Sequence, residues 1–224
     1  MGLPGKVLAE RLNYSFSRPE LLETALTHRS MGRKNNERLE FLGDAVLGLC
    51  VSESLYELFP QVEEGDLSRL RASLVNRETL AAIAGELALG DELLLGGGEL
   101  KSGGFRRSSI LADALEAVIG AVYLDGGFEP AQRLIQSLYA DRLKRLPPPA
   151  ELKDPKTRLQ ECLQGQGLQL PEYHVEAILG KDHEQRFQVI CSVPGSTFRA
   201  QGEGSSRRKA EQAAAAAVLK RLTQ

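Results

Sequence analysis

Residues 110–124 constrain the fold more than any other stretch, because they carry only two charged side chains, Asp113 and Glu116. A helix that is apolar nearly all round is buried in a protein core. We therefore expect both carboxylates to lie away from open solvent. A buried carboxylate needs an ionic partner or a metal ion. The partner is either an arginine of the chain, such as Arg38 or Arg69, or a bound cation.

A second helix is predicted from Asn36 to about Phe59, where Pro60 stops it. Its acidic residues Glu37, Glu40 and Asp44 are spaced three and four apart, so they fall within about 60° of one another on one helix face. Like charges on one face repel each other. Taken alone, this stripe is explained most simply as a solvated acidic face, but two acidic helices in one chain favour a shared cation. The apolar residues on its other faces are expected in the core: Leu39, Leu42, Val46 and Leu49.

The chain changes character after residue 146. Residues 1–146 show only helical patterns, and residues 147–153 begin with three prolines, which cannot continue a helix and which stiffen a connection. Residues 154–224 then alternate polar and apolar side chains in three segments that lie between two helical ones, as strands do. The predicted architecture is multidomain: an all-α domain, a proline-rich linker and a small α+β domain of order α-β-β-β-α.

Charge and cysteine content narrow the function classes. Residues 1–150 carry 17 Lys and Arg against 21 Asp and Glu, a net charge of −4, whereas residues 151–224 carry 11 against 9, a net charge of +2. The overall charge of −2 argues against a simple polyelectrolyte binder. The three cysteines lack metal-site spacing and predict reduced thiols. With no apolar run near 18 residues and no signal peptide, we expect a cytoplasmic protein that contacts no membrane.

Three segments resemble the endonuclease domain of the ribonuclease III family. Residues 37–44 (ERLEFLGD) resemble its signature block, residues 110–117 (ILADALEA) its second block, and residues 101–107 (KSGGFRR) its glycine-rich loop. The resemblance implies a catalytic, dimerising domain over residues 1–146. The glycine-rich loop is interpreted either as a phosphate-gripping element or as a mobile connection.

The resemblance also assigns site residues. Four carboxylates are expected to converge from two crossing helices around Mg²⁺, for which Mn²⁺ can substitute, because carboxylate-only sites select hard divalent cations. Asp44 and Glu116 are the residues to which we assign catalysis. A fifth carboxylate, Glu64, matches a family glutamate that contacts RNA or assists at the site, although an ordinary solvated loop also explains it. The four expected metal ligands are Glu40, Asp44, Asp113 and Glu116.

Two further residues of the signature block lie beside the carboxylate stripe. Phe41 is explained either as a core residue or, as in the family, as a plug in a dimer interface. Glu37 is expected to contact RNA or the other subunit. Before this block, the lone histidine His28 is interpreted as structural. The chain contains no His-Asp dipeptide, which argues against the HD-type class of phosphohydrolases.

Residues 154–224 resemble a double-stranded-RNA-binding domain. The N-terminus of the last helix offers free N–H groups, a favourable dipole and three cations to phosphate. Glu211 stands where many such domains have a third lysine, so we expect weaker and more salt-sensitive binding than in lysine-rich relatives. The expected RNA contacts, which include minor-groove contacts to 2′-hydroxyls, are Gln160, Glu161, His183, Arg207, Arg208 and Lys209.

The leading hypothesis is a Mg²⁺-dependent, double-strand-specific endoribonuclease that acts as a homodimer and leaves 5′-phosphate and 3′-hydroxyl ends with short 3′ overhangs. The family implies processing of ribosomal RNA precursors and of some messenger and transfer RNA. The alternative is a non-catalytic double-stranded-RNA-binding protein on the same fold, which would be expected to lack some of the four carboxylates. A phosphohydrolase for small substrates fits the acids but leaves the C-terminal domain unexplained, so no small-molecule substrate is expected.

Overall fold

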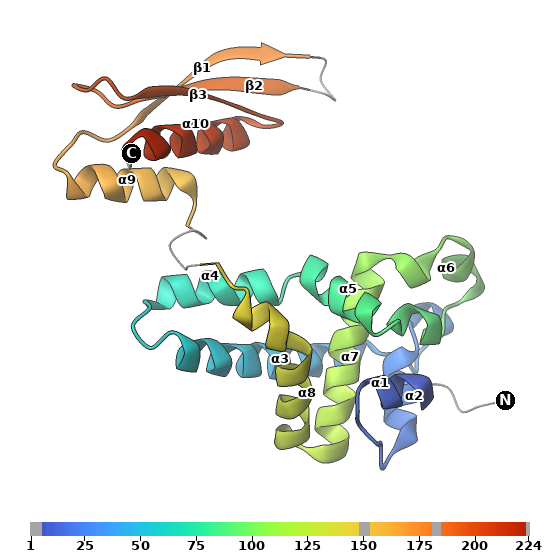
Figure 1. The fold of residues 1–224 in the computed structure, drawn as a ribbon. Coiled ribbons are helices and arrows are strands. Elements are labelled where there is room, and N and C mark those ends of the chain that lie inside the picture. Colours follow the sequence, from blue (N-terminus) through green and yellow to red (C-terminus); the bar gives the residue numbers. More distant parts are fainter. Residues whose placement is uncertain (1–5, 148–152, 181–184, 223–224) are drawn as a thin grey trace. The chain divides into compact units, whose positions relative to one another are not determined.

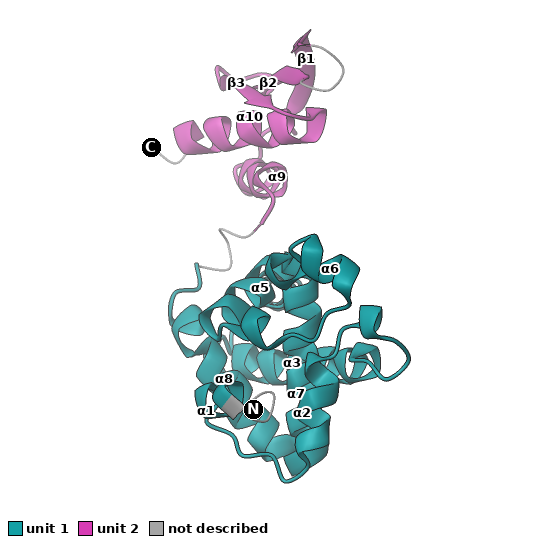
Figure 2. Ribbon diagram, turned by 90° about the vertical axis from the view of Figure 1, so that its right-hand side faces the viewer, with its two compact units in different colours: residues 1–147 teal, residues 148–224 magenta. Residues whose placement is uncertain are grey.

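The computed structural model describes residues 6–147, 153–180 and 185–222. The chain divides into two compact units, residues 1–147 and residues 148–224 (Figure 2).

The first unit is built from helices, and its described residues contain no β-strand beyond a single bridge between Thr27 and Leu94. Three short 3₁₀ turns, Arg29–Met31, Leu89–Glu92 and Gly104–Arg106, connect the α-helices. The α-helices are α1 (Lys6–Arg11), α2 (Pro19–Leu26), α3 (Glu37–Leu58), α4 (Glu64–Leu74), α5 (Arg77–Glu86), α6 (Gly97–Lys101), α7 (Ser108–Gly126) and α8 (Phe128–Lys144).

Helix α7 lies at the centre of this unit, and α2, α3, α5 and α8 pack around it (Figure 1). Its side chains explain this position, because the helix is apolar on almost every face. Leu115, Val118 and Ile119 are completely buried. The sequence prediction of a buried helix over residues 110–124 is therefore confirmed.

Two glycines allow α3 and α7 to cross with their backbones in direct contact. A Cβ atom built on Gly43 would lie 1.7 Å from the carbonyl oxygen of Glu116, and one built on Gly120 would lie 2.3 Å from the carbonyl oxygen of Leu39. Neither contact can relax by rotating a side chain, because the opposing atoms belong to the backbone. The crossing therefore holds the carboxylate-bearing parts of both helices, around Glu40 in α3 and around Asp113 and Glu116 in α7, at a short separation.

The segment before α3 is tied to the segment before α6. The amide N–H of His28 donates to the carbonyl of Leu94 (3.0 Å), and the amide N–H of Leu94 donates to the carbonyl of Leu26 (2.9 Å). The amide N–H of Asn36 donates to the carbonyl of Thr27 (2.9 Å), which joins the same segment to the start of α3. Residues 26–36 are thus fixed on both sides.

Three local expectations differ from the structure. Leu49, expected in the core, is 57% exposed, whereas Leu39 and Val46 are buried. The expected glycine-rich loop, residues 101–107, begins at the last residue of the short helix α6 and contains a 3₁₀ turn. Helix α4 begins at Glu64, so Glu64 lies in the first turn of a helix and not in a loop.

The second unit has the expected α-β-β-β-α order. Its three strands form one antiparallel sheet in the order β1-β2-β3, with Val175 opposite Val189 and Cys191 opposite Ala200. The register shifts once, between Val175 and Ala177 in β1. The elements are α9 (Pro155–Gly165), β1 (Glu172–Leu179), β2 (Arg186–Ser192), β3 (Arg199–Gly204) and α10 (Arg207–Leu222).

Helix α10 lies against β3 at very short range. A Cβ atom on Gly202 would lie 2.1 Å from the amide nitrogen of Ala214, and one on Gly204 would lie 2.5 Å from the amide nitrogen of Ala210. Both alanines are completely buried. The small side chains of the alanine run thus let this helix pack closely on the sheet.

The three cysteines are free thiols. Among the described helices, none combines the length and the apolar character that crossing a membrane requires.

The glycine crossing generates a stability prediction. Gly43→Ala should lower the free energy of unfolding by about 2–4 kcal/mol, because overpacking against backbone cannot be relieved. Gly85→Ala in α5 is the control, since a Cβ there meets nothing within 4 Å. The control should be neutral or stabilising by up to about 1 kcal/mol, since alanine favours helix over glycine. Urea unfolding of both variants checks this, and equal midpoints would contradict the close crossing.

Candidate functional site

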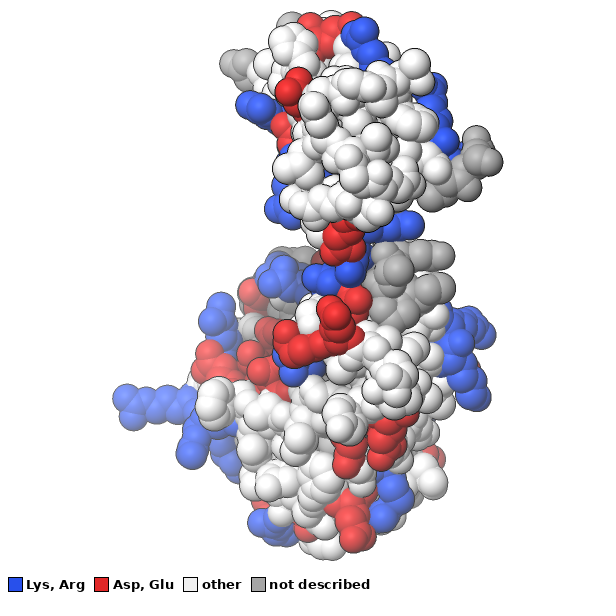
Figure 3. Space-filling model, turned by 90° about the vertical axis from the view of Figure 1, so that its left-hand side faces the viewer, with Lys and Arg blue, Asp and Glu red and all other residues white. Residues whose placement is uncertain are grey.

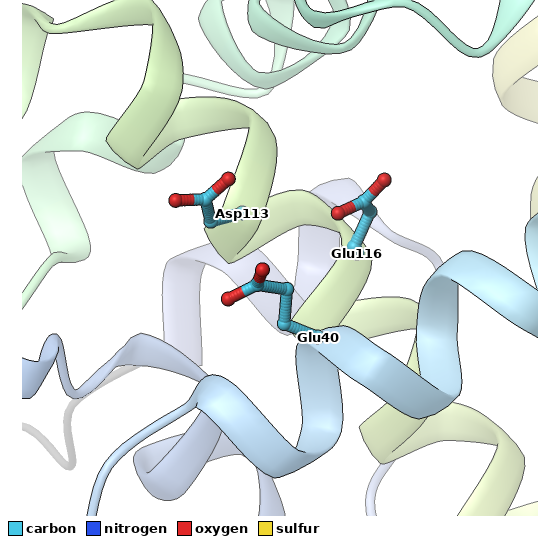
Figure 4. Close-up of side chains that lie close together, drawn as sticks. All are labelled: Glu40, Asp113 and Glu116. Atoms are coloured by element: carbon cyan, nitrogen blue, oxygen red, sulfur yellow. The ribbon is translucent and has the colours of Figure 1, made fainter.

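Glu40 of α3 and Asp113 and Glu116 of α7 form a cluster of carboxylates. Each offers an oxygen atom, and these three oxygens lie within 4.8 Å of one another. Figure 4 shows the three side chains pointing into one space from the two crossing helices. Glu40 precedes Gly43 by three residues, and the backbone of Glu116 touches Gly43, so the crossing itself brings the acids together. All three are partly buried.

The cluster is electrostatically unfavourable when only protein atoms are considered. The pKa of Glu116 is raised from 4.5 to about 8, first by burial and then by the negative charges of Asp44, Glu40 and Asp113. Burial also raises the pKa of Glu40, and the charge of Asp113 adds to the effect. A divalent cation would remove this repulsion, and oxygen ligands are those that hard cations prefer. The residues present therefore fit a metal ion.

Basic residues near Asp113 offset part of this repulsion. Burial raises the pKa of Asp113, while Arg77, His28 and Arg29 act in the opposite direction. Sequence patterns did not indicate that Arg77 and Arg29 lie near the acids. Arg77 opens α5, and only the packing of α5 on α7 brings it near the cluster, so no local sequence signal could have identified it.

The arginine partners considered from the sequence do not neutralise the cluster. Arg69 pairs with Asp66, its neighbour on α4. Within the described part of the chain, neither Asp113 nor Glu116 makes an ion pair with Arg38 or any other basic residue.

Asp44 and Glu37 lie beside the cluster without joining it. Asp44 is exposed and is not among the residues whose oxygens lie within 4.8 Å, although its charge acts on Glu116. Glu37 is exposed, accepts a hydrogen bond from the Asn35 side chain (3.1 Å) and lies 3.8 Å from the guanidinium of Arg29. The stripe predicted from the sequence therefore supplies one member of the cluster and two flanking charges.

Glu64 and Phe41 occupy other surfaces. Glu64 accepts a hydrogen bond from the hydroxyl of Ser68 (2.6 Å) and lines a groove of about 500 Å³ together with Leu49 and Tyr56. Phe41 is 81% exposed, so its interpretation as a core residue is wrong. A groove of about 770 Å³, lined in part by Leu42, lies next to Phe41.

In the second unit, Glu211 holds two cations in place. Its carboxylate accepts from the ammonium of Lys156 (2.6 Å) and from the guanidinium of Arg207 (2.9 Å). The bond to Lys156, followed by that to Arg207, lowers the pKa of Glu211 against the effect of burial. Lys156 also lies 4.3 Å from the ring centre of Tyr173. Glu211 thus orients Arg207 at the start of α10.

The other expected RNA contacts lie at the surface. Arg208 is 3.8 Å from Asp154, and the amide of Lys209 donates to the hydroxyl of Ser206 (3.3 Å). Gln160 is exposed on α9, and Glu161 accepts a hydrogen bond from Lys153 (3.0 Å). His183 lies outside the described residues.

Charge is distributed unevenly on the surfaces. On the face of the second unit seen in Figure 3, charged side chains of both signs lie at the edges around an uncharged centre. On the first unit, acidic and basic side chains form separate small patches (Figure 3). Neither pattern is that of a uniformly basic surface.

Family models match both units. The model described as "Ribonuclease-III-like" matches residues 18–143, and the model described as "Double stranded RNA binding motif" matches residues 155–222.

Relatives match over the whole chain. The protein named Ribonuclease 3 from Alkalilimnicola ehrlichii is 56% identical over 222 residues, which cover 99% of this chain and 97% of that protein. Ribonuclease 3 from Photobacterium profundum is 55% identical over 222 residues, which cover 99% of each.

Solved structures match the first unit. The nuclease domain of ribonuclease III from Campylobacter jejuni superposes with a TM-score of 0.60 at 48% identity, covering 63% of this chain and 97% of that one. A second structure of that domain has a TM-score of 0.58 at 50% identity, covers 61% of this chain and 99% of that one, and is described as flexible in a region involved in dimer formation.

The raised pKa of Glu116 predicts how stability depends on pH. Between pH 4.5 and about pH 8, the Glu116 carboxyl group has lost its proton in the unfolded chain but keeps it in the folded chain. Without divalent cations, the free energy of unfolding should therefore fall as the pH rises through this range. Glu116→Gln should reduce that slope and stabilise the protein at pH 8 by up to about 5 kcal/mol, since each pKa unit between 4.5 and about 8 corresponds to about 1.4 kcal/mol.

Thermal unfolding at several pH values, with and without Mg²⁺, checks this prediction. Mg²⁺ should raise the Tm of the wild type more at pH 8 than at pH 5, and should leave Glu116→Gln nearly unchanged. Glu57→Gln, an exposed position on the same helix as Glu40, should behave as the wild type. A Glu116→Gln variant that is less stable than the wild type at pH 8 without metal would contradict the account.

The ion pairs of Glu211 predict a second pH effect, of opposite sign. The pKa of Glu211 is lower in the folded chain than in the unfolded chain. The stability contributed by its ion pairs should therefore be fully present above the ordinary pKa of glutamate and be lost as the pH falls through the lowered pKa of the folded chain. Glu211→Gln should destabilise the second unit at pH 7 by about 1–2 kcal/mol, the scale of hydrogen bonds to charged groups. Amide hydrogen exchange of α10 measures this, with exposed Glu172→Gln as the control. Unchanged exchange in α10 would show that the pairs contribute nothing.

Proposed function

The chain belongs to the ribonuclease III family of double-strand-specific endoribonucleases, and we propose that it cuts RNA at the carboxylate cluster with Mg²⁺ as the cofactor. The observation that carries this proposal is the convergence of Glu40, Asp113 and Glu116 from two helices, with no basic residue paired to the two acids of α7 in the described chain. Mn²⁺ has the same preference for oxygen ligands and should substitute.

The chain's own residues have distinct roles in this proposal. Glu40, Asp113 and Glu116 would hold the ion, and Asp44, exposed one turn further along α3, would be the fourth carboxylate of the site. When bound, Mg²⁺ supplies the positive charge that lowers the pKa of a water molecule and stabilises the leaving 3′-oxygen. Asp44 and Glu116 orient that water toward the scissile phosphate. No serine, cysteine or histidine nucleophile is needed.

The second unit binds the duplex in this proposal. Arg207, Arg208 and Lys209 present cations at the N-terminus of α10, where free amides also favour phosphate. Gln160 and Glu161 of α9, together with His183, contact 2′-hydroxyls in the minor groove. Binding and cutting are thus assigned to different units.

We further propose that the protein acts as a homodimer. Phe41, Leu49 and Tyr56 lie on α3 and are 81%, 57% and 74% exposed. Large exposed apolar side chains in one stripe are typical of a protein interface, and the Campylobacter jejuni nuclease domain is described as forming dimers. Phe41 would insert into the partner, while Glu37 and Glu64 would contact RNA or the other subunit.

A dimer has consequences for the products. Each subunit would cut one strand, leaving 5′-phosphate and 3′-hydroxyl ends with short 3′ overhangs. We propose precursors of ribosomal RNA and some messenger and transfer RNA as cytoplasmic substrates. A non-catalytic duplex-binding protein would have no reason to keep all four acids, and a small-substrate phosphohydrolase would have no use for the second unit.

Cleavage of a labelled RNA duplex tests the proposal, with a length of about 30 base pairs, roughly twice the span of one such RNA-binding module. The wild type should cut with Mg²⁺ and not with EDTA. Glu116→Gln should bind the duplex in a gel shift but cut it about 1,000-fold more slowly or worse, equivalent to about 4 kcal/mol. Glu57→Gln should cut normally. A wild type that binds but never cuts with Mg²⁺ or Mn²⁺ would refute the enzymatic function.

A further inference from the structure

A cavity of about 370 Å³ adjoins the carboxylate cluster. Glu40 and Asp113 form one part of its wall, and His28, Arg29 and Arg107 form another. The cavity therefore lies between the proposed metal ligands and a set of hydrogen-bond donors. His28 was expected from the sequence to be structural, and its surroundings now point to a further role.

The hydrogen bonds around His28 assign the position of its ring proton. The amide N–H of Ser30 donates to Nδ1 of the imidazole (3.2 Å), and the hydroxyl oxygen of Ser30 lies 2.9 Å from the same atom. The amide N–H of Gly96 donates to that hydroxyl oxygen (2.8 Å), so the hydroxyl proton is free to point at Nδ1. Two donors directed at Nδ1 make it the acceptor. The ring proton of the neutral imidazole is therefore on Nε2.

The backbone fixes where this ring lies. His28 donates its amide N–H to Leu94 (3.0 Å). A Cβ atom on Gly96 would lie 2.6 Å from the carbonyl oxygen of Ser30, so glycine is required for the approach that lets Gly96 reach the serine hydroxyl. The imidazole is thus held at the cavity wall by contacts that leave Nε2 uncommitted, and within the described residues no protein group hydrogen-bonds Nε2.

Charge identifies the kind of ligand. Glu99 is paired with Arg107 (3.1 Å) and Glu37 lies near Arg29 (3.8 Å), so these pairs nearly cancel. Glu40 and Asp113 are assigned to the metal. What remains to face a ligand is His28 with its uncommitted Nε2–H, the outer sides of two guanidinium groups, and the side chains of Asn36 and Ser109. The amide nitrogen Nδ2 of Asn36 is buried and has no hydrogen-bond partner among the described residues. Such a surface suits an anion, and the RNA backbone supplies a phosphate at every nucleotide.

We propose that His28 is a phosphate-binding residue of this site, donating from Nε2–H to a non-bridging oxygen of an RNA phosphate in the cavity, and that Ser30 orients its ring. This inference rests on the proposed function, since the phosphate belongs to the strand being cut.

Two substitutions of His28 test the proposal, because each places an amide group where one of the two ring nitrogens lies. Glutamine places an amide N–H where Nε2 lies, whereas asparagine reaches only as far as Nδ1. His28→Asn should slow single-turnover duplex cleavage about 10- to 100-fold, the scale of a hydrogen bond to a charged group. His28→Gln should retain most of the activity, and Ser30→Ala should fall between them. Equal rates for His28→Asn and the wild type would overturn the proposal.

Two readouts do not depend on turnover. Imidazole ¹⁵N NMR on the full chain, which has three histidines, should show the His28 proton on Nε2 in the wild type and a mixture of tautomers in Ser30→Ala. In Glu116→Gln, which should not cut, adding the RNA duplex should shift the Nε2–H resonance of His28. A proton on Nδ1, or no shift with bound duplex, would overturn the proposal.

The effect of Mg²⁺ on stability distinguishes a His28 that binds phosphate from a His28 that only supports Asp113, a proposed metal ligand. Mg²⁺ should raise the Tm of His28→Asn as much as that of the wild type, because His28 contacts phosphate and not the ion. Loss of the Mg²⁺ effect in His28→Asn would instead assign His28 to the support of Asp113 and overturn the proposal. If the wild type fails to cut, the proposed function fails, and the duplex-induced shift of the His28 resonance still decides whether the cavity binds phosphate.

Discussion

The backbone contact between Gly43 of α3 and Gly120 of α7 sets the geometry on which the catalytic unit depends. A side chain at either position would meet the backbone of the opposite helix, at Glu116 or at Leu39. The two helices can approach so closely only because both positions lack a Cβ atom. Every oxygen of the carboxylate cluster comes from these two helices, so the separation of the acids follows from this crossing more than from any loop.

The same geometry creates an electrostatic cost that folding must overcome. Burial and mutual repulsion raise the pKa of Glu116 to about 8, and the apolar packing of α7 compensates elsewhere in the helix, where Leu115 and Val118 are fully buried. Sites that place like charges together are often kept for function at the expense of stability. In the second unit, by contrast, the acidic residue Glu211 is paired with two cations, Lys156 and Arg207. These ion pairs stabilise the unit and also orient Arg207 at its surface.

Sequence patterns predicted what depends on local periodicity. The buried helix around Leu115, the acidic stripe at Glu40 and the α-β-β-β-α order were all accessible from spacing and composition. Exposure of Leu49 was not, because an apolar residue on a helix can face either the core or a partner surface. The positions of Arg77 and His28 near Asp113 were also inaccessible, since they arise from the packing of α5 on α7 and from the hydrogen bonds that tie residues 26–36 to Leu94 and α3, and not from local sequence.

We propose that the crossing of α3 and α7 builds a site for a divalent cation. Anomalous diffraction from crystals grown with Mn²⁺ is the sharpest test of this proposal. The account predicts a strong anomalous peak at roughly 2.0–2.3 Å from carboxylate oxygens, the coordination distance of hard cations of this size. The oxygens should belong to Glu40, Asp113 and Glu116. An ordered cluster with no peak at saturating Mn²⁺, or with a peak only at other acidic surfaces, would contradict it.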